Sequence, residues 1–275
     1  MSEKSFNPEV PKNTMKTQRN FILILMLTFL FSCELPHQPG PMPKEILDLN
    51  FEPGLNILGI VRLNGYQAES FIYIEEVLKT KDYYAEENEF YITGASVKIQ
   101  NSKDSLFTFE IYDEIDSMRY TNPTFIPEER ETYYLNVEAE TENGELHVTA
   151  KTTMPAIPSL DKNTIILRDD RILLDLITTE DAFRYDIVLF FAEEDIRRTL
   201  YSSGPGVQTI EMKYSKAFGK PVLLGIAAYD RNLTDYLNAS SSIIPQTYQE
   251  DISTVEGGYG CFGAISIQTF DLGEL

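Results

Sequence analysis

Apolar and polar residues alternate with a period of two along much of this 275-residue chain, and no other feature constrains its fold as strongly. In such a segment every second side chain lies on the same face, which suits a strand of an antiparallel sheet with one buried face. No strong helical periodicity competes with this pattern in the first half of the folded region. The pattern predicts strands at Ala95–Ile99, Phe107–Ile111, Leu135–Ala139 and Leu146–Ala150.

The last two of these segments flank Asn143-Gly144, which predicts a β-hairpin because both residues readily adopt positive φ. Two earlier segments, Leu55–Leu63 and Phe71–Leu78, are more continuously apolar and fit central strands. The 16 Tyr and 16 Phe residues also favour strands.

The second half of the chain is expected to continue as strands, with one or two short helices. Glu193–Leu200 and Leu233–Ser240 are the two candidate helices, and Gly257–Gly260 is a candidate turn. Strands are expected near Ile165–Leu167, Ile172–Ile177, Phe183–Leu189, Val207–Met212, Val222–Tyr229 and Ala264–Leu272.

Pro155 and Pro158 mark the expected boundary between two domains, since both follow a predicted strand. Residues 50–155 have the length of an immunoglobulin-like β-sandwich, and residues 156–275 are expected to form a second β-sandwich. Glu131–Val137 resembles a late strand of such a sandwich, where a tyrosine often caps the corner. The fold class is therefore mainly β, with two antiparallel β-sandwich domains.

The N-terminal region has the features of an export signal. Phe21–Phe31 is apolar except for Thr28, is too short to span a bilayer as a helix, and follows Lys16 and Arg19. Met15 begins a conventional signal of this kind, so the true start is either Met1 or Met15.

Leu30-Phe31-Ser32-Cys33 resembles a bacterial lipobox, in which the cysteine is acylated after cleavage before it. We therefore expect residues 1–32 to be a lipoprotein signal peptide and Cys33 to be the lipidation site, which anchors the protein to a membrane. An ordinary signal peptide with an incidental cysteine and an uncleaved anchor are the alternatives.

Residues 33–49 are expected to form an extended tether. Four prolines lie between positions 36 and 43, and proline fixes φ and lacks a hydrogen-bond donor. The tether would hold the folded body away from the membrane. His37 lies in it, so a catalytic role for His37 is not expected.

The charge balance excludes some partners. The chain has 23 Lys and Arg against 43 Asp and Glu, which gives a net charge of −20. Such an acidic chain should repel nucleic acid, because it has no excess of cations to replace phosphate counterions.

The sequence contains no recognisable catalytic, cofactor or metal motif. His147 is the only histidine of the folded region and is expected on the solvent face of a strand, which leaves a serine or cysteine triad without another base. Cys261 is expected to be a small buried residue. The acidic clusters lack the spacing of a calcium loop and are interpreted as solvated surface, although a loop-built calcium site stays open. These clusters are Glu86–Glu89, Asp113–Asp116, Asp169-Asp170 and Glu193–Asp195.

The order of several short motifs resembles an uncharacterised domain-of-unknown-function family of Bacteroidota-type outer-membrane lipoproteins. This resemblance implies a cell-envelope protein, often encoded near TonB-dependent receptors, and therefore an accessory of nutrient uptake. The resemblance implies no active-site residue for this chain. The motifs are the lipobox at Cys33, Leu55–Val61, Gly94–Ile99, Glu131–Val137, Thr152–Pro155 and Gly257–Ala264.

Three function classes follow, in order of preference. The first is a non-enzymatic, lipid-anchored binding or accessory module, with a TonB-dependent receptor as its partner and no cofactor. The second is a structural or adhesive spacer on the cell surface. The third is a glycan hydrolase that uses two carboxylates, which would need a cleft with both groups about 5 to 10 Å apart.

Overall fold

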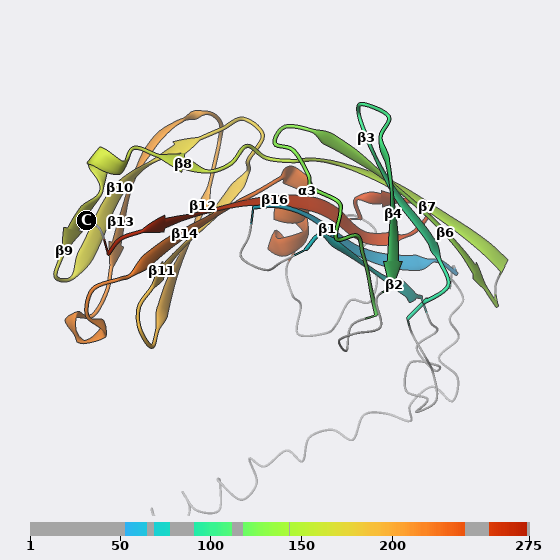
Figure 1. Ribbon diagram of the computed structural model, residues 1–275, viewed down its shortest axis with the longest axis horizontal. Helices are drawn as coiled ribbons and strands as arrows, with labels where there is room; N and C mark the ends of the chain where they lie inside the picture. The colour runs from blue at the N-terminus through green and yellow to red at the C-terminus, as the bar shows by residue number, and fades with distance from the viewer. Residues whose placement is uncertain are drawn as a thin grey trace, which may run out of the picture. The chain divides into compact units, whose positions relative to one another are not determined.

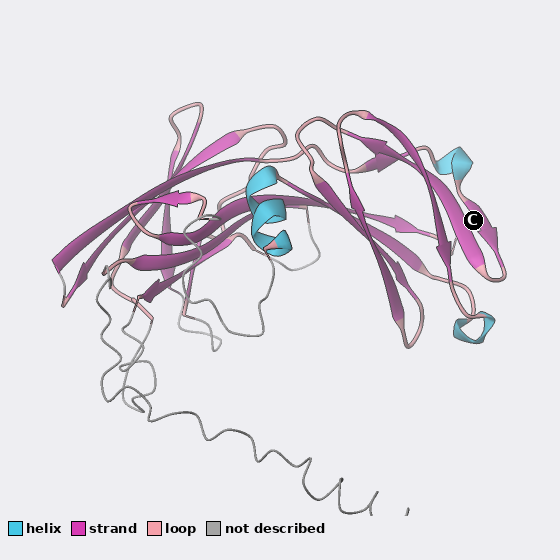
Figure 2. Cartoon of the chain, turned by 180° about the vertical axis from the view of Figure 1, so that it is seen from behind, coloured by secondary structure: helices cyan, strands magenta, loops and turns pink. Residues whose placement is uncertain are grey.

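The computed structural model describes residues 53–64, 69–77, 91–111, 118–142, 144–239 and 253–273. The predicted fold class is confirmed, since the described chain is mainly β-strand with one α-helix (Figure 1, Figure 2). Most strands pair in a twelve-stranded sheet, and the others form a four-stranded sheet. The predicted immunoglobulin-like form of the sandwiches stays a prediction.

The first sandwich consists of two parts of the large sheet that face each other across one core. Inward side chains of β1 pack with those of β3, β6 and β7 in this core, for example Ile57, Val97, Leu135 and Val148. The alternation predicted from the sequence is confirmed here, because these residues occupy every second position of their strands. The strands are β1 (Leu55–Leu63), β2 (Phe71–Glu76), β5 (Arg119–Thr121), β4 (Leu106–Ile111), β3 (Ser96–Asn101), β6 (Thr132–Thr141), β7 (Gly144–Thr153) and β15 (Val255–Glu256), in their order across the sheet. The hairpin predicted around Gly144 is confirmed by the pairing of β6 with β7.

The second sandwich places the other end of the large sheet against the small sheet. Its separate core includes Leu174, Ile187, Ile210 and Ile226. The large sheet contributes β12 (Asp195–Tyr201), β11 (Arg184–Phe190) and β14 (Leu223–Tyr229), and the small sheet contains β13 (Gly206–Lys213), β10 (Arg171–Thr178), β8 (Ser159–Leu160) and β9 (Ile166–Arg168).

The closing strand, β16 (Tyr259–Asp271), takes part in both sandwiches (Figure 1). It pairs in parallel with β1 from Tyr259 to Ser266 and antiparallel with β14 from Ile265 to Asp271. The parallel pair is the exception to the antiparallel pairing expected of the sandwiches. Residues 50–275 form one compact unit, and the predicted domain boundary at residue 155 stays a prediction.

One of the two predicted helices is present, and the prediction of the other is wrong. The prediction at Leu233–Ser240 is confirmed by α3 (Arg231–Asn238), which packs against β16 (Figure 2). Glu193–Leu200 instead lies largely in β12, which pairs with β11 along its whole length. Hydrogen bonds to a neighbouring strand override the weak local helical preference of this segment. The described residues also contain two short 3₁₀ helices, Lys162–Thr164 and Lys216–Phe218.

The glycine run before β16 allows backbones to approach closely. Gly260 has a φ of +106°, and a Cβ atom there would lie 2.0 Å from the carbonyl oxygen of Ile57. The predicted turn is present at Gly257 and Gly258, whereas Tyr259 and Gly260 already belong to the strand. Only glycine allows β16 to pair with β1 at this point.

No helix among the described residues is both long and apolar enough to cross a membrane. The predicted signal peptide (1–32), Cys33 and the tether (33–49) lie outside the described residues. The acidic clusters Glu86–Glu89 and Asp113–Asp116 also lie outside them.

Candidate functional site

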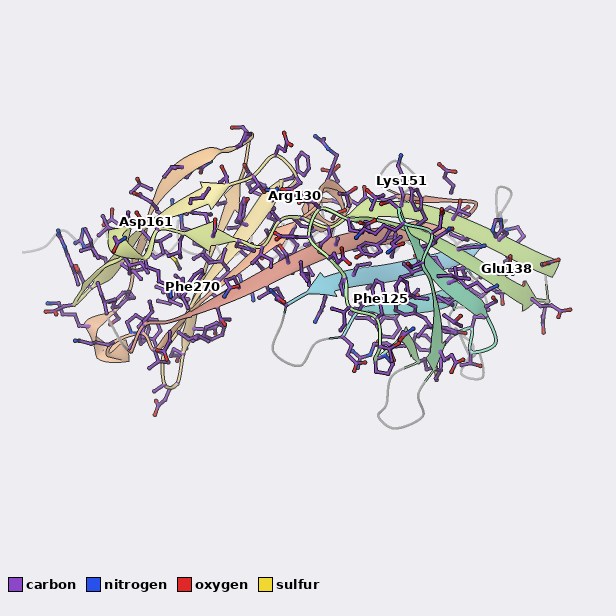
Figure 3. All side chains as sticks on the ribbon, turned by 45° about the horizontal axis from the view of Figure 1, so that its top comes forward. Phe125, Arg130, Glu138, Lys151, Asp161 and Phe270 are labelled. Atoms are coloured by element: carbon purple, nitrogen blue, oxygen red, sulfur yellow. The ribbon has the colours of Figure 1, made fainter. Side chains whose placement is uncertain are left out.

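A polar groove of about 600 Å³ lies on the outer face of the first sandwich. It covers the solvent side of β3, β6 and β7, and Figure 3 shows Lys151 on the β7 part of this surface. The groove is lined by Lys98, Gln100, Leu106, Tyr134, Leu135, Asn136, His147, Thr149, Ala150, Lys151, Asn232, Ser253, Thr254 and Glu256.

Strand register brings the polar side chains of this groove into rows. Lys98 pairs with Asn136, Asn136 pairs with Thr149, and Thr149 pairs with Glu256. Because directly paired residues on one face lie about 5 Å apart, these four side chains form a continuous polar row across four strands.

A second row runs parallel to the first and includes apolar surface. Gln100 pairs with Leu106 on one side and with Tyr134 on the other, and Tyr134 pairs with Lys151. Leu106 is 60% exposed and Tyr134 is 47% exposed. An exposed ring therefore lies between an amide and an ammonium group, which offers a ligand both packing and hydrogen bonds.

His147 is on the solvent face of β7, as predicted, and lines the groove. Its Nε2 atom lies 2.7 Å from Oδ1 of Asn136. Since an amide oxygen only accepts hydrogen bonds, Nε2 is the donor, and Nδ1 of the neutral ring is then an acceptor. His147 therefore contributes hydrogen-bonding capacity to the groove, and its ring donates to the side-chain amide of Asn136.

The end of α3 closes one side of the groove. Asn232 donates from its side-chain nitrogen to the carbonyl oxygens of Lys151 (2.8 Å) and Phe262 (2.9 Å), and so connects α3 to β7 and β16. Asp230 caps the helix by accepting a hydrogen bond from the backbone N–H of Leu233 at 2.9 Å. Hydrogen bonds within the protein therefore hold this wall of the groove in place without a ligand.

Cys261 lies inside the protein, as the sequence predicted. Burial raises the pKa of its thiol to about 12, and its sulfur donates a weak hydrogen bond to the carbonyl oxygen of Asn232 at 3.7 Å. The thiol is therefore protonated at neutral pH and is a poor nucleophile.

The most buried carboxylate of the second sandwich belongs to a satisfied polar cluster. Asp186 accepts hydrogen bonds from Arg184, from Thr199 at 2.7 Å and from Tyr229 at 3.1 Å. Burial raises the pKa of Asp186, but the hydrogen bonds of Arg184 and Thr199 outweigh burial, so the net shift is downward. Each carboxylate oxygen of Asp186 therefore accepts two hydrogen bonds from within the protein.

Among the described residues, no three His, Cys, Asp or Glu side chains gather in a group that could hold a metal ion. Two of the acidic clusters noted in the sequence lie among the described residues. In the first of them, Asp170 forms an ion pair with Arg171 at 3.0 Å. Glu193, Glu194 and Asp195 are exposed. The clusters are therefore solvated or paired where the structure describes them.

The residues of the groove, apart from His147, were not singled out from the sequence. Lys98, Gln100, Asn136, Thr149 and Lys151 lie at polar positions of alternating strands, so the pattern predicts only that they face solvent. Only the register between strands, which the sequence does not reveal, places Lys98, Asn136 and Thr149 in one row. The predicted lipidation site, Cys33, lies outside the described residues.

The fold and the groove define a β-sandwich protein with a groove lined mainly by polar side chains. No family model matches the chain, and no curated protein matches it either. Among solved structures, a DUF4785 family protein from Legionella pneumophila is similar to it, with 11% sequence identity and a TM-score of 0.27. The similarity covers 63% of this chain and 52% of that chain, so the chain spans about half the length of this relative.

Proposed function

We propose that this protein is a lipid-anchored, non-catalytic binding protein of the bacterial outer membrane, and that its groove holds an extended polyhydroxylated ligand such as an oligosaccharide. The polar groove on β3, β6 and β7 carries this proposal. It is open, it is large enough for several sugar rings, and its walls offer both donors and acceptors.

The chemistry of the groove supports a polyhydroxylated ligand. Amide side chains such as those of Gln100 and Asn136 donate and accept at once, which suits neighbouring hydroxyl groups that also do both. The exposed ring of Tyr134 offers a flat apolar surface for the C–H face of a sugar. Two lysines and one glutamate line the groove, so it is less acidic than the chain as a whole.

The same residues support binding without catalysis. Glu256 is the one carboxylate among the described residues that line the groove. Hydrolysis of a glycosidic bond by the usual mechanism needs a pair of carboxylates. The glycan is therefore proposed to be a ligand of this protein and the substrate of another protein.

The envelope location and the receptor partner rest on the sequence. The lipobox at Cys33 and the proline-rich tether would hold the folded body beside the membrane. The resemblance to Bacteroidota-type lipoproteins encoded near TonB-dependent receptors supports such a receptor as the partner. We propose that the groove captures ligand next to the receptor and increases its local concentration there.

Glycan binding by the purified, lipidated protein in mild detergent tests the ligand class. A glycan array identifies candidates, and titration calorimetry then compares Tyr134→Ala and Gln100→Ala with the unchanged protein. We expect each substitution to weaken binding by about tenfold, or about 1.4 kcal/mol. Tyr201→Ala is the matched control, because Tyr201 is 56% exposed and lies on β12 of the second sandwich. Equal loss in the control, or no glycan bound at all, would contradict the groove assignment.

Purification from native membranes tests the anchor and the partner separately. We expect a TonB-dependent receptor in stoichiometric amount, and we expect Cys33→Ser to abolish acylation and release the protein from the membrane fraction. If acylation is confirmed but no receptor is purified with the protein, the receptor is not its partner, and the protein is a free-standing surface binder or spacer. Membrane retention of the Cys33→Ser variant would contradict the lipid anchor.

A further inference from the structure

Two arginines lie over the same aromatic ring on the layer of the first sandwich that is opposite to the groove. The guanidinium carbon of Arg62, on β1, is 5.4 Å from the centroid of the Phe71 ring, and that of Arg119, on β5, is 5.6 Å from it. Phe71 lies on β2, the strand between them. Arg119 is also 6.0 Å from the ring centroid of Tyr73. Both cations therefore lie against the same aromatic ring.

Both guanidinium groups have a buried donor without a hydrogen-bond partner. The Nε atoms of Arg62 and Arg119 are both buried and unpartnered. Neither arginine forms an ion pair with a carboxylate of the described residues. A buried donor left unpaired costs about 1–3 kcal/mol, so an acceptor for either Nε–H group would stabilise the protein.

Other arginines of the same chain show what a partnered arrangement looks like. Arg184 forms two hydrogen bonds to the carboxylate of Asp186, at 3.1 and 3.0 Å. Arg171 contacts both Asp170 and Glu211. Among the described residues, Arg62 and Arg119 differ from these arginines in having no carboxylate partner.

Among the described residues, no carboxylate shifts the pKa of Arg62. Burial lowers the pKa of Arg62, and the charge of Arg119 lowers it further, which shows that the two guanidiniums repel each other. Tyr229 is the other group that acts on Arg62, but burial raises the pKa of Tyr229 to about 12, so its hydroxyl is neutral at pH 7. Arginine keeps its proton in proteins, so the repulsion persists until an anion neutralises it.

We infer that Arg62 and Arg119 form a binding site for a small oxyanion, such as a phosphate, sulfate or carboxylate group. Guanidinium groups recognise these anions through paired N–H donors, and the aromatic platform of Phe71 holds both groups in place. Because the Nε atoms are closed to water, an anion first contacts the outer nitrogens of these two partly exposed arginines, and it reaches Nε only if the side chains move. The site lies on the layer opposite to the groove and does not depend on the function proposed for the groove.

Equilibrium dialysis with radiolabelled phosphate and sulfate tests the site directly on the full lipidated protein in detergent, at constant ionic strength. We expect about one anion to bind per chain. Arg62→Gln and Arg119→Gln should each weaken binding at least tenfold, whereas Arg168→Gln, an exposed arginine on β9, should leave it unchanged. Arg62→Lys keeps the charge but loses the paired donors, so it should bind with intermediate affinity.

Thermal unfolding gives a second readout that a purely structural role would not produce. Without added anion, Arg62→Gln should unfold at the same temperature as the unchanged protein or higher, because one of two repelling charges is gone. With phosphate or sulfate, only the unchanged protein and Arg168→Gln should gain stability. The inference is overturned if no anion binds, if all variants bind equally, or if only vesicles of phosphatidylglycerol and no free anion bind through these arginines.

Discussion

Thr152 donates a hydrogen bond of 2.6 Å from its side-chain oxygen to Oδ2 of Asp230, and thereby joins β7 to the cap of α3. Both side chains are buried, with Thr152 3% exposed and Asp230 4% exposed. The other carboxylate oxygen of Asp230 accepts from the N–H of Leu233. One buried carboxylate therefore holds both the helix that closes the groove and the strand that forms its floor.

Stability should fall as the pH rises through about 6, because of Asp230. Burial raises the pKa of Asp230 from 3.8 to about 6, and the hydrogen bond from Thr152 offsets only part of this effect. The folded state therefore binds a proton more tightly than the unfolded state, and this contribution is complete below pH 3.8 and lost above pH 6. The difference amounts to roughly 3 kcal/mol. Urea unfolding between pH 4 and pH 8 measures it, with Asp230→Asn as the reference protein.

Asp230→Asn should remove this pH dependence and retain the cap, since asparagine is also a good N-cap residue. Asp230→Ala should lose about 1–2 kcal/mol at every pH, because it removes the cap as well as the charge. If the unchanged protein and Asp230→Asn show the same slope of stability against pH, the buried carboxylate is not the titrating group.

Gly263→Ala should destabilise the contact between β16 and α3 by about 1–3 kcal/mol. A Cβ atom at Gly263 would lie 2.7 Å from Cβ of Leu233 and 3.1 Å from Oδ1 of Asp230, which is closer than packed atoms allow. The first turn of α3 would have to move away from the strand. Chemical denaturation measures the loss. Gly94→Ala is the control, because a Cβ atom there meets nothing within 4 Å, and a similar loss in both variants would contradict the steric cause.

Tyr133→Phe and Tyr185→Phe should each cost about 1–3 kcal/mol of unfolding free energy. The hydroxyl of Tyr133 accepts from the N–H of Glu128 at 2.7 Å, and that of Tyr185 accepts from the N–H of Thr179 at 3.0 Å. Removing either hydroxyl leaves a backbone donor unpaired beside a buried ring. Tyr134→Phe is the matched control for stability, since Tyr134 is 47% exposed and should change by less than about 0.5 kcal/mol. An equal effect at all three positions would rule out the specific role of these hydrogen bonds.

These two tyrosines also show which parts of the fold the sequence can predict. Within Glu131–Val137, where the sequence predicts a corner tyrosine, Tyr133 accepts a hydrogen bond from the upstream N–H of Glu128. The immunoglobulin-like corner itself stays a prediction. Tyr185 repeats the arrangement in the second sandwich without having been expected there. Alternation identifies a strand and its buried face from local residues alone, which explains why β3, β6 and β7 agree with the prediction.

Properties that depend on distant residues were harder to predict. The sequence predicts a helix at Glu193–Leu200, but most of this segment lies in β12 because pairing with β11 satisfies its backbone. The groove depends on the register of four strands, and the arginine pair depends on the proximity of β1 and β5 on either side of β2. Neither arrangement leaves a motif along the chain, so the sequence predicts His147 only as a surface residue and does not bring the lining of the groove together.

Cys261 should resist thiol reagents in the folded protein. Burial raises the pKa of its thiol to about 12, so the reactive thiolate is almost absent at pH 8, and the side chain is fully buried. Once Cys33 is acylated, Cys261 is the remaining cysteine of the chain, and one thiol should react after denaturation. A colorimetric thiol assay on the lipidated protein, with and without 6 M guanidinium, measures both states. Rapid modification of the native protein would show that β16 opens readily, and would contradict the tight packing of α3 over this strand.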